Sequence, residues 1–442
     1  MNNKVHQLQA TSPLSEWLSY LENAHVKTID LGLERVKSVA EQLDLLHPAP
    51  FIITVGGTNG KGTTCRLLEM ILLEANLRVG VYSSPHLLHY AERVRIQNQQ
   101  LADELHCQSF DFINKNKTHS LTYFEFSTLS ALYLFKQAKL DVVILEVGLG
   151  GRLDATNIVD NDIAVITSID IDHTDFLGDD RETIGFEKAG IFRQHKMAII
   201  GEPNIPNSIF EQGKIQNCQL ICRDIEWTFK QVNETWCWQQ GKVRLENLPI
   251  PQIPLANAAT ALAVVQQLPF SIFKSQIVRA LQQVELTGRF QKIKLTQLSN
   301  IAKKLNIAVE NLPSIIIDVG HNPHAARYLA EKLTALKIQT RGKIFAICGI
   351  LKDKDAKGIL SPLLSIIDDW YCIGLQGSRG QSGNDLLNLL KQVAESENHF
   401  LSAQSDDNIF SVFQTVVNNS HKNDIILVFG SFYTVSDFLQ LL

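Results

Sequence analysis

The 442-residue sequence lacks several features that would assign it to a specialised class of protein. It has no apolar stretch of 18 residues, and its first residues, M-N-N-K-V-H-Q-L-Q-A, lack the apolar core of a signal peptide. No Lys/Arg-rich run is interleaved with aromatic residues, and the formal net charge is −5. These absences argue against a membrane or a nucleic acid as a partner.

Cysteine is also scarce. Seven cysteines are scattered along the chain, and after Cys218 and Cys222 no second pair follows with the spacing of zinc ligands. A structural zinc site is therefore not expected. Reduced thiols are the simpler interpretation, and they indicate a cytoplasmic location.

Apolar residues make up 45% of the chain and charged residues 20%, which is typical of a globular protein with a large core. The length exceeds that of one ordinary domain. Short Val/Ile runs alternate with helical patterns, which predicts an α/β fold whose mostly parallel sheet has helices on both faces. The expected strands are 51–55, 78–82, 142–147, 163–168 and 197–201.

The rest of the chain predicts a second domain. Residues 202–254 alternate in polarity and contain three tryptophans, which indicates a small antiparallel addition to the first domain. Apolar strands restart after a polar, lysine-bearing segment, at 315–319, 343–348, 370–373 and 425–429. We therefore expect a first domain over 1–290, a linker or insertion over 291–312, and a smaller Rossmann-like α/β domain over 313–442. No G-x-G-x-x-G occurs, so dinucleotide binding is not predicted.

The most informative segment is F-I-I-T-V-G-G-T-N-G-K-G-T-T at 51–64, an apolar strand that leads into a glycine-rich loop and a helix. Glycines let backbone N–H groups turn toward phosphates, and Lys61 adds a positive charge. The strict phosphate-loop pattern is not met, because Val55 replaces the first glycine and Gly62 separates Lys61 from Thr63. The alternative is a glycine-rich turn that opens an ordinary helix. The context favours a P-loop ATPase domain that binds ATP.

Polar residues follow several of the expected strands. Glu146 ends the run D-V-V-I-L-E, where an acidic residue would hold Mg²⁺ beside phosphates, although it could instead cap a helix or form a salt bridge. Ser83, the loop 148–157, and Asp172 with His173 follow other strands. The carboxyl ends of parallel strands meet at one edge of a sheet, so these groups should lie close together.

Eight motifs in order resemble the folylpolyglutamate synthase family of the Mur ligase superfamily, and in particular its bacterial bifunctional members. They are L-E-N-A-H-V-K-T-I-D-L-G-L-E-R-V, G-G-T-N-G-K-G-T-T, S-S-P-H-L, T-Y-F-E-F, E-V-G-L-G-G-R-L-D-A-T-N, D-H-T-D-F-L-G, E-K-A-G-I-F and D-V-G-H-N-P-H-A. The resemblance extends over nearly the whole chain. It implies an ATPase domain and a smaller Rossmann-like domain, with the active site between them.

The resemblance also implies roles for individual residues. The expected ATP contacts are Gly57, Thr58, Asn59, Gly60, Lys61, Asn257, Arg289 and Asp318. The expected metal ligands are Ser83, Glu146 and His173. The expected pterin contacts are Glu22, Asn23, Ala24, His25, Thr122, Leu153, Asp154 and Ala155. His321 and Ser431 are expected to line a glutamate site. Lys61, His173 and Lys188 are the expected catalytic residues, and Lys188 matches a lysine that is carbamylated in the family.

The function implied by this resemblance is ATP-dependent ligation of L-glutamate to 7,8-dihydropteroate and to reduced folates, through an acyl phosphate. We expect a monomer that uses ATP as a substrate and two Mg²⁺ ions, with a monovalent cation as a further candidate. A folylpolyglutamate synthase without dihydropteroate activity is the first alternative. A P-loop ATPase switch is an alternative from another class, and a catalytically inactive folate-binding protein is a third. A cell-wall Mur ligase is disfavoured, because only 50 residues precede the expected first strand.

Overall fold

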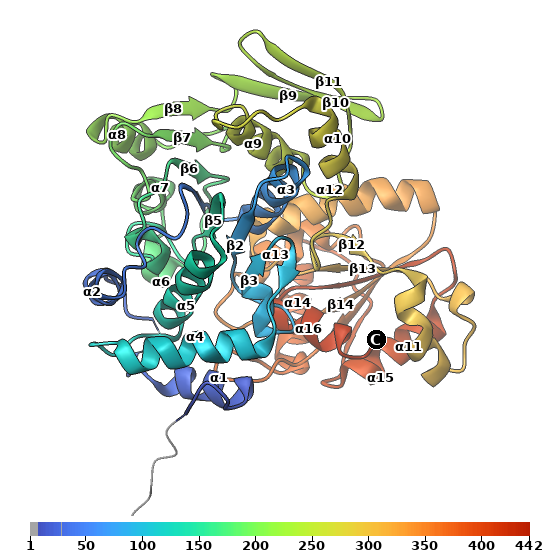
Figure 1. Cartoon of the computed structure of the whole chain (residues 1–442). Helices are drawn as coiled ribbons and strands as arrows, with labels where there is room; N and C mark the ends of the chain where they lie inside the picture. Colours follow the sequence, from blue (N-terminus) through green and yellow to red (C-terminus); the bar gives the residue numbers. More distant parts are fainter. Residues whose placement is uncertain (1–7, 28) are drawn as a thin grey trace, which may run out of the picture. The chain divides into compact units, whose positions relative to one another are not determined.

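The computed structural model describes residues 8–27 and 29–442, and the chain divides into two compact units, Met1–Val284 and Glu285–Leu442. Within the described residues, the first unit contains an eight-stranded sheet in the order β4-β3-β2-β5-β1-β6-β7-β8 (Figure 1). Strands β2, β5, β1, β6, β7 and β8 are parallel, and β3 and β4 extend one edge in antiparallel fashion. The strands are β1 (Phe51–Gly56), β2 (Val79–Tyr82), β3 (Val94–Ile96), β4 (Gln99–Gln100), β5 (Val142–Glu146), β6 (Ile163–Ile166), β7 (Met197–Ile200) and β8 (Gln219–Cys222).

Helices cover both faces of this sheet because its central strands are apolar on both sides (Figure 1). Successive residues of a strand point to opposite faces. Ile53 and Val55 of β1 therefore pack in one core with α3, α9 and α10, whereas Ile52 packs in the other with α1, α2, α4 and α5. The helices are α1 (Leu14–Asn23), α2 (Glu34–Gln42), α3 (Lys61–Glu74), α4 (Asp103–Asn116), α5 (Tyr123–Ala138), α6 (Thr174–Leu177), α7 (Arg181–Ala189), α8 (Asn207–Ile215), α9 (Leu255–Val265) and α10 (Lys274–Gln283).

The segment 202–254 is only partly the antiparallel addition that we predicted. Its second half forms a three-stranded antiparallel sheet of β9 (Trp227–Val232), β10 (Thr235–Gln240) and β11 (Val243–Pro249). Its first half forms α8 and β8, and β8 pairs in parallel with β7. The sequence signal for β8 is weak because this edge strand has only four residues, Q-L-I-C.

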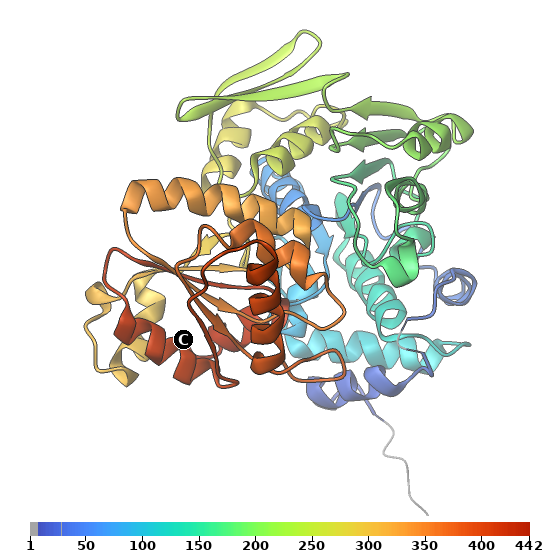
Figure 2. The same cartoon turned by 180° about the vertical axis from the view of Figure 1, so that it is seen from behind.

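The second unit is also α/β, with helices beside a sheet (Figure 2). The sheet has six strands in the order β12-β13-β17-β14-β15-β16. All of its strand pairs are parallel except β12 with β13. Its strands are β12 (Gln291–Lys292), β13 (Ser314–Asp318), β14 (Ile344–Cys348), β15 (Asp369–Cys372), β16 (Ala403–Ser405) and β17 (Ile425–Phe429). Its helices are α11 (Ser299–Lys304), α12 (Pro323–Thr340), α13 (Ala356–Leu360), α14 (Gly383–Ser396), α15 (Ile409–Asn419) and α16 (Phe432–Leu439).

The predicted α/β architecture, with a mostly parallel first sheet and a smaller second α/β unit, is confirmed. Residues 291–312, which we expected as a linker or insertion, contain β12 and α11 and contribute the buried side chains of Ile293, Leu298 and Ile301. In the described part of the chain, no helix combines the length and the apolar character needed to cross a bilayer.

One core residue makes a testable prediction about acid stability. His106 on α4 is fully buried against the rings of Tyr90 and Phe110, and burial lowers its pKa from 6.5 to about 4. Because the unfolded chain binds the proton more tightly, stability should fall as the pH falls from about 6.5 toward 4, by on the order of 3 kcal/mol in full. In His106→Phe, the free energy of unfolding should depend less on pH. Urea unfolding measured at several pH values tests this. The same change at the exposed His119 is the control, and an unaltered slope in His106→Phe would contradict the prediction.

Candidate active site

The phosphate loop joins the end of β1 to the start of α3. Gly57 and Gly60 have φ angles of 144° and 84°, in the region that favours glycine. The loop therefore delivers the chain to the N-terminus of α3, where the first backbone N–H groups and the helix dipole favour an anion. The Lys61 ammonium donates to the carbonyl of Gly57 at 2.9 Å, which places its charge beside the loop.

The residues that directly follow the neighbouring strand β6 hold this loop in shape. The backbone N–H of Thr58 donates to the carbonyl of Ser168 at 2.8 Å, and that of Asn59 donates to the Ser168 hydroxyl at 3.0 Å. The Thr167 hydroxyl donates to the carbonyl of Asn59 at 2.6 Å. These contacts fix the loop before any ligand binds, so less order has to be gained on binding.

Asn257, which we expected at the nucleotide, does lie beside the loop. It belongs to α9, and its side-chain amide donates to the hydroxyl of Thr63 at 2.8 Å. A Cβ atom added to Gly60 would lie 2.4 Å from the amide oxygen of Asn257. A side chain at position 60 would therefore displace the Asn257 amide, in addition to straining the backbone at a φ of 84°.

The change Gly60→Ala should consequently weaken ATP binding. The left-handed backbone adds about 1–2 kcal/mol of strain to the steric conflict with Asn257, so we expect affinity to fall at least about tenfold. Gly241→Ala is a matched control, because Gly241 has a φ of 55° but nothing lies within 4 Å of an added Cβ atom. Calorimetric titration with a non-hydrolysable ATP analogue measures both. Equal affinities for the two variants would remove Gly60 from the nucleotide site.

Two of the three expected metal ligands lie at adjacent strand ends. Glu146 ends β5 with 5% of its surface exposed. Ser83 directly follows β2, whose last residue, Tyr82, is in register with Leu145 of β5. The Arg95 guanidinium donates to the Ser83 hydroxyl at 3.2 Å. Oxygen ligands of this kind suit Mg²⁺.

His173, the third expected ligand, precedes α6 in the loop that follows β6. Its side chain is exposed, and its φ angle of 54° is unusual for a residue other than glycine. Within residues 8–27 and 29–442, no group of three His, Cys, Asp or Glu side chains is arranged to hold a metal ion. The expected ligands Ser83, Glu146 and His173 would not form such a group, because only Glu146 and His173 are of these residue types.

Lys188, which matches the carbamylated lysine, is buried on α7 with 2% of its surface exposed. Burial, followed by the positive charge of Lys61, lowers its pKa to about 7. A substantial fraction of the amine is therefore neutral near neutral pH. Only the neutral amine can react with CO₂, so the site suits carbamylation.

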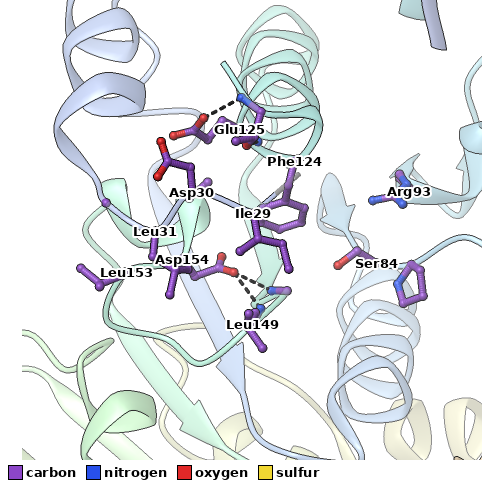
Figure 3. A pocket seen from close by; sticks show the side chains of 15 residues that line it. Ile29, Asp30, Leu31, Ser84, Arg93, Phe124, Glu125, Leu149, Leu153 and Asp154 are labelled. Carbon is purple, nitrogen blue, oxygen red and sulfur yellow. Dashed lines mark hydrogen bonds between the residues drawn. The ribbon is translucent and has the colours of Figure 1, made fainter. Parts of the chain in front are cut away.

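A pocket of about 260 Å³ opens at the same edge of the first sheet (Figure 3). Its walls come from the loop after α1, the loop after β2, the start of α5 and the loop after β5. The lining residues are Ile29, Asp30, Leu31, Gly32, Ser84, Pro85, Arg93, Thr122, Phe124, Glu125, Gly148, Leu149, Leu153, Asp154 and Ala155. Four of the expected pterin contacts, namely Thr122, Leu153, Asp154 and Ala155, are among them.

The other expected pterin contacts, Glu22, Asn23, Ala24 and His25, do not line this pocket. His25 is nevertheless connected to it, because its imidazole contacts the carboxylate of Asp30 at 3.1 Å. The pocket is lined instead by later residues of the same motif, I-D-L-G at 29–32. Glu22 and Asn23 lie at the exposed end of α1, whereas the chain that follows α1 lines the cavity.

The acidic side of the pocket is held by internal hydrogen bonds. Arg35 donates to Asp30 at 2.7 Å and to Glu125 at 2.9 Å, and Glu125 accepts the backbone N–H of Thr122 at 2.7 Å. Asp154 accepts the N–H groups of Gly148 and Leu149 (Figure 3), and also that of Thr156. Burial raises the pKa of Asp154. These carboxylates are therefore fixed in position before a ligand arrives.

In the second unit, four expected site residues lie close in space. Asp318 ends β13 and accepts the N–H of Phe290, the neighbour of Arg289, at 2.7 Å. The Arg289 guanidinium lies over the ring of Phe432 at 5.4 Å, and the ring of His321 packs on the same residue at 6.0 Å. Ser431 precedes Phe432 and caps α16. Arg289 and His321 therefore contact Phe432, which Ser431 directly precedes, and Asp318 bonds the neighbour of Arg289.

Several residues of the pocket carry no distinct signal in the sequence. Asp30 lies within a quoted motif, yet no pattern distinguishes it from its neighbours. Arg93 was not selected at all. The segment V-R-I-Q-N-Q-Q that follows Arg93 mixes polar and apolar residues, and this pattern does not indicate a binding site.

Comparison with known proteins identifies the family. Residues 55–243 match the Mur ligase middle domain and residues 305–432 match the Mur ligase glutamate ligase domain. A relative from Haemophilus influenzae, named dihydrofolate synthase/folylpolyglutamate synthase, is 64% identical over 440 residues, which cover 99% of each chain. The Escherichia coli relative of the same name is 48% identical over 98% of this chain and 96% of its own.

Solved structures agree with these sequence matches. The structure of E. coli FolC in complex with DHPP and ADP has a TM-score of 0.90, with 48% identity over 98% of this chain and 99% of the other. A bifunctional folylpolyglutamate synthase/dihydrofolate synthase with Mn, AMPPNP and L-glutamate bound has a TM-score of 0.86, with 52% identity over 98% of both chains. Because the agreement in sequence and fold extends along almost the full length, this chain belongs to the dihydrofolate synthase/folylpolyglutamate synthase family.

Proposed function

We propose that this protein uses ATP to join L-glutamate to 7,8-dihydropteroate, giving dihydrofolate, and then adds further glutamates to reduced folates. The observation that carries this proposal is the placement of the phosphate loop and the pocket at one edge of the first sheet. The loop follows β1, and the pocket walls follow β5, which pairs with β1, and β2, which pairs with β5 on its other side. An ATP γ-phosphate and a substrate carboxylate can therefore approach each other there.

The reaction follows from these parts. The loop amides and Lys61 bind the phosphates of ATP and stabilise the charge that develops on them. The carboxylate of the pterin substrate attacks the γ-phosphorus, so that ADP leaves and an acyl phosphate forms. The amine of L-glutamate attacks the acyl carbon, phosphate leaves, and an amide bond remains. The chemistry requires no serine or cysteine nucleophile.

The metal would be held by Ser83, Glu146 and His173. Two divalent ions are proposed, with Mg²⁺ as the natural choice for oxygen ligands beside phosphates. When bound, the ions would neutralise charge on the transferred phosphoryl group. Lys188, once carbamylated, would offer a carboxylate in place of an ammonium and so complete a second site. A monovalent cation is a further candidate ligand.

The remaining residues extend the proposal to the second unit. Arg289 and Asp318 would contact ATP, and His321 and Ser431 would line the site for L-glutamate. We propose that residues 1–290 act as the ATPase domain and 313–442 as the glutamate-ligase domain, joined by 291–312. Closure of the two domains would keep water from the acyl phosphate. The protein is proposed to act as a monomer in the cytoplasm, where its seven free cysteines would stay reduced.

The test is ADP release by the purified protein with ATP, Mg²⁺ and L-glutamate, with 7,8-dihydropteroate added or omitted and the products identified by mass. We expect ADP only when the pterin is present, together with a product one glutamyl residue heavier. Extension of tetrahydrofolate substrates alone would identify a folylpolyglutamate synthase without the first activity. ATP hydrolysis without any pterin would favour an ATPase switch instead.

A further inference from the structure

Arg93 is a buried cation on the wall of the pocket. It is the last residue of η1 (Tyr90–Arg93), and 8% of its surface is exposed. Its guanidinium lies 5.9 Å from the ring centre of Tyr90 and 5.3 Å from that of Tyr123. Its Nε donates to Nδ1 of His86 at 2.8 Å. The side chain is therefore held rigidly by two aromatic rings and one hydrogen bond.

The charge balance of the pocket sets Arg93 apart. Its ionisable lining residues are Asp30, Glu125, Asp154 and Arg93. The first two acids share Arg35, and Asp154 accepts three backbone N–H groups. Among the residues that the structure describes, no carboxylate forms an ion pair with Arg93. A buried charge without an opposite charge is costly, so the cavity favours an anionic ligand at Arg93.

The neighbouring groups do not provide that anion. Burial, followed by the charge of Arg93, lowers the pKa of His86 to about 4, so the imidazole that accepts from Arg93 is neutral at physiological pH. Glu92, the adjacent acid in the chain, already accepts the backbone N–H groups of Leu87, Leu88 and His89 at 2.7–2.8 Å. Its carboxylate serves to shape the loop before η1.

The position of Arg93 also fits a ligand that reaches toward the phosphates. Figure 3 shows Arg93 beside Ser84, apart from Asp30, Glu125 and Asp154, with Ile29 and Phe124 in between. The carbonyl of Arg93 accepts the N–H of Ser83 at 2.9 Å, which ties it to a proposed metal ligand. The pocket thus has an acidic end, an apolar middle and a cationic end.

We propose that Arg93 binds the carboxylate of the pterin substrate and so orients that end of the molecule for phosphorylation. The heterocycle then lies toward Asp30 and Asp154, and the aromatic ring of the substrate lies against Ile29 and Phe124. This inference rests on the proposed function, because it assumes that a pteroate occupies the pocket. It assigns to Arg93 a role in selecting a carboxylate over a neutral group of the same shape.

The test compares the binding of 7,8-dihydropteroate with that of its carboxamide, which has the same shape but no charge. The wild-type protein should prefer the carboxylate by about tenfold to a hundredfold, the range for a charge-assisted hydrogen bond. Arg93→Gln should abolish this preference by weakening carboxylate binding alone. Arg78→Gln is the control, because Arg78 pairs with Asp141 on the surface, does not line the pocket and should not affect the ratio.

Binding of AMPPNP to each variant reports whether the first unit is folded. Should Arg93→Gln not fold, Arg93→Lys retains a positive charge over the two rings, and the preference should shrink without vanishing. A preference that persists in a folded Arg93→Gln overturns the inference. If Arg93→Gln weakens the binding of the carboxylate and the carboxamide equally, the inference is also overturned, since Arg93 would then only shape the pocket. If the wild type binds neither ligand, the proposed function itself fails, and the inference fails with it.

Discussion

Replacing Glu146 by alanine or glutamine should abolish metal-dependent turnover. Glu146 is the buried carboxylate at the end of β5, beside Ser83 and one strand from the phosphate loop. Loss of a metal ligand removes several kcal/mol of charge stabilisation from the phosphoryl transfer, so kcat should fall at least about a thousandfold. The measurement is ADP release at saturating ATP, L-glutamate and 7,8-dihydropteroate across a range of Mg²⁺ concentrations.

The control for this experiment lies just before the same strand. Asp141 pairs with Arg78 at 2.6 Å on the surface, so Asp141→Asn removes a carboxylate without approaching the site. Such a surface pair contributes little to stability, and turnover should stay near that of the wild type. Binding of Mn²⁺, measured directly, separates metal loss from misfolding. Near-normal activity in Glu146→Ala would remove this residue from the metal site.

The second large effect is expected at Lys188. Lys188→Ala should lower turnover at least about a hundredfold, the size of effect seen when the surroundings of a metal ligand are disrupted. A small carboxylic acid such as acetate should restore part of the activity, because it can occupy the space of the missing carbamate. Lys188→Arg should stay inactive, since a guanidinium does not become neutral in a protein.

Activity should also depend on CO₂ and pH in a defined direction. Because the pKa of Lys188 is about 7, lowering the pH below 7 protonates the amine and opposes carbamate formation. In CO₂-depleted buffer the activity should fall, and bicarbonate should restore it more effectively above pH 7 than below. A ¹³C carbamate signal after labelling with ¹³CO₂ is the direct readout.

The control position for this experiment is Lys196, which pairs with Asp162 on the surface. Lys196→Ala should leave the dependence of activity on CO₂ intact. Full activity of Lys188→Ala, or a missing carbamate signal, would contradict the assignment.

The sequence predicted the parts of the fold that depend on local pattern. The runs that form β1, β5 and β13 are apolar on both faces, so their burial in a parallel sheet followed from composition alone. The edge strand β8 was missed because four residues of mixed polarity carry little signal. The carboxyl-end position of Glu146 also followed from pattern, since it ends an apolar run.

Other site features could not be predicted because they depend on tertiary contacts. Asp30 lines the pocket from a loop between two helices. Its partner Arg35 is 5 residues away in the chain, and Arg35 in turn bonds Glu125, which is 90 residues further on. Arg93 gains its significance only from the rings of Tyr90 and Tyr123 and from the pocket beside it. Asn257 and Lys188 were selected only through the family resemblance. Their burial and contacts give physical reasons for those choices.

The hydrogen bond between Asn257 and Thr63 spans 194 residues and therefore has a consequence for how the protein is made. A growing chain on the ribosome carries the phosphate loop long before α9 exists. Contacts between segments so distant in sequence form late, after the entropy of closing a long loop has been overcome. The nucleotide site is thus completed only near the end of synthesis of the first unit. A nascent chain that stops before α9 would lack the contact between Asn257 and Thr63.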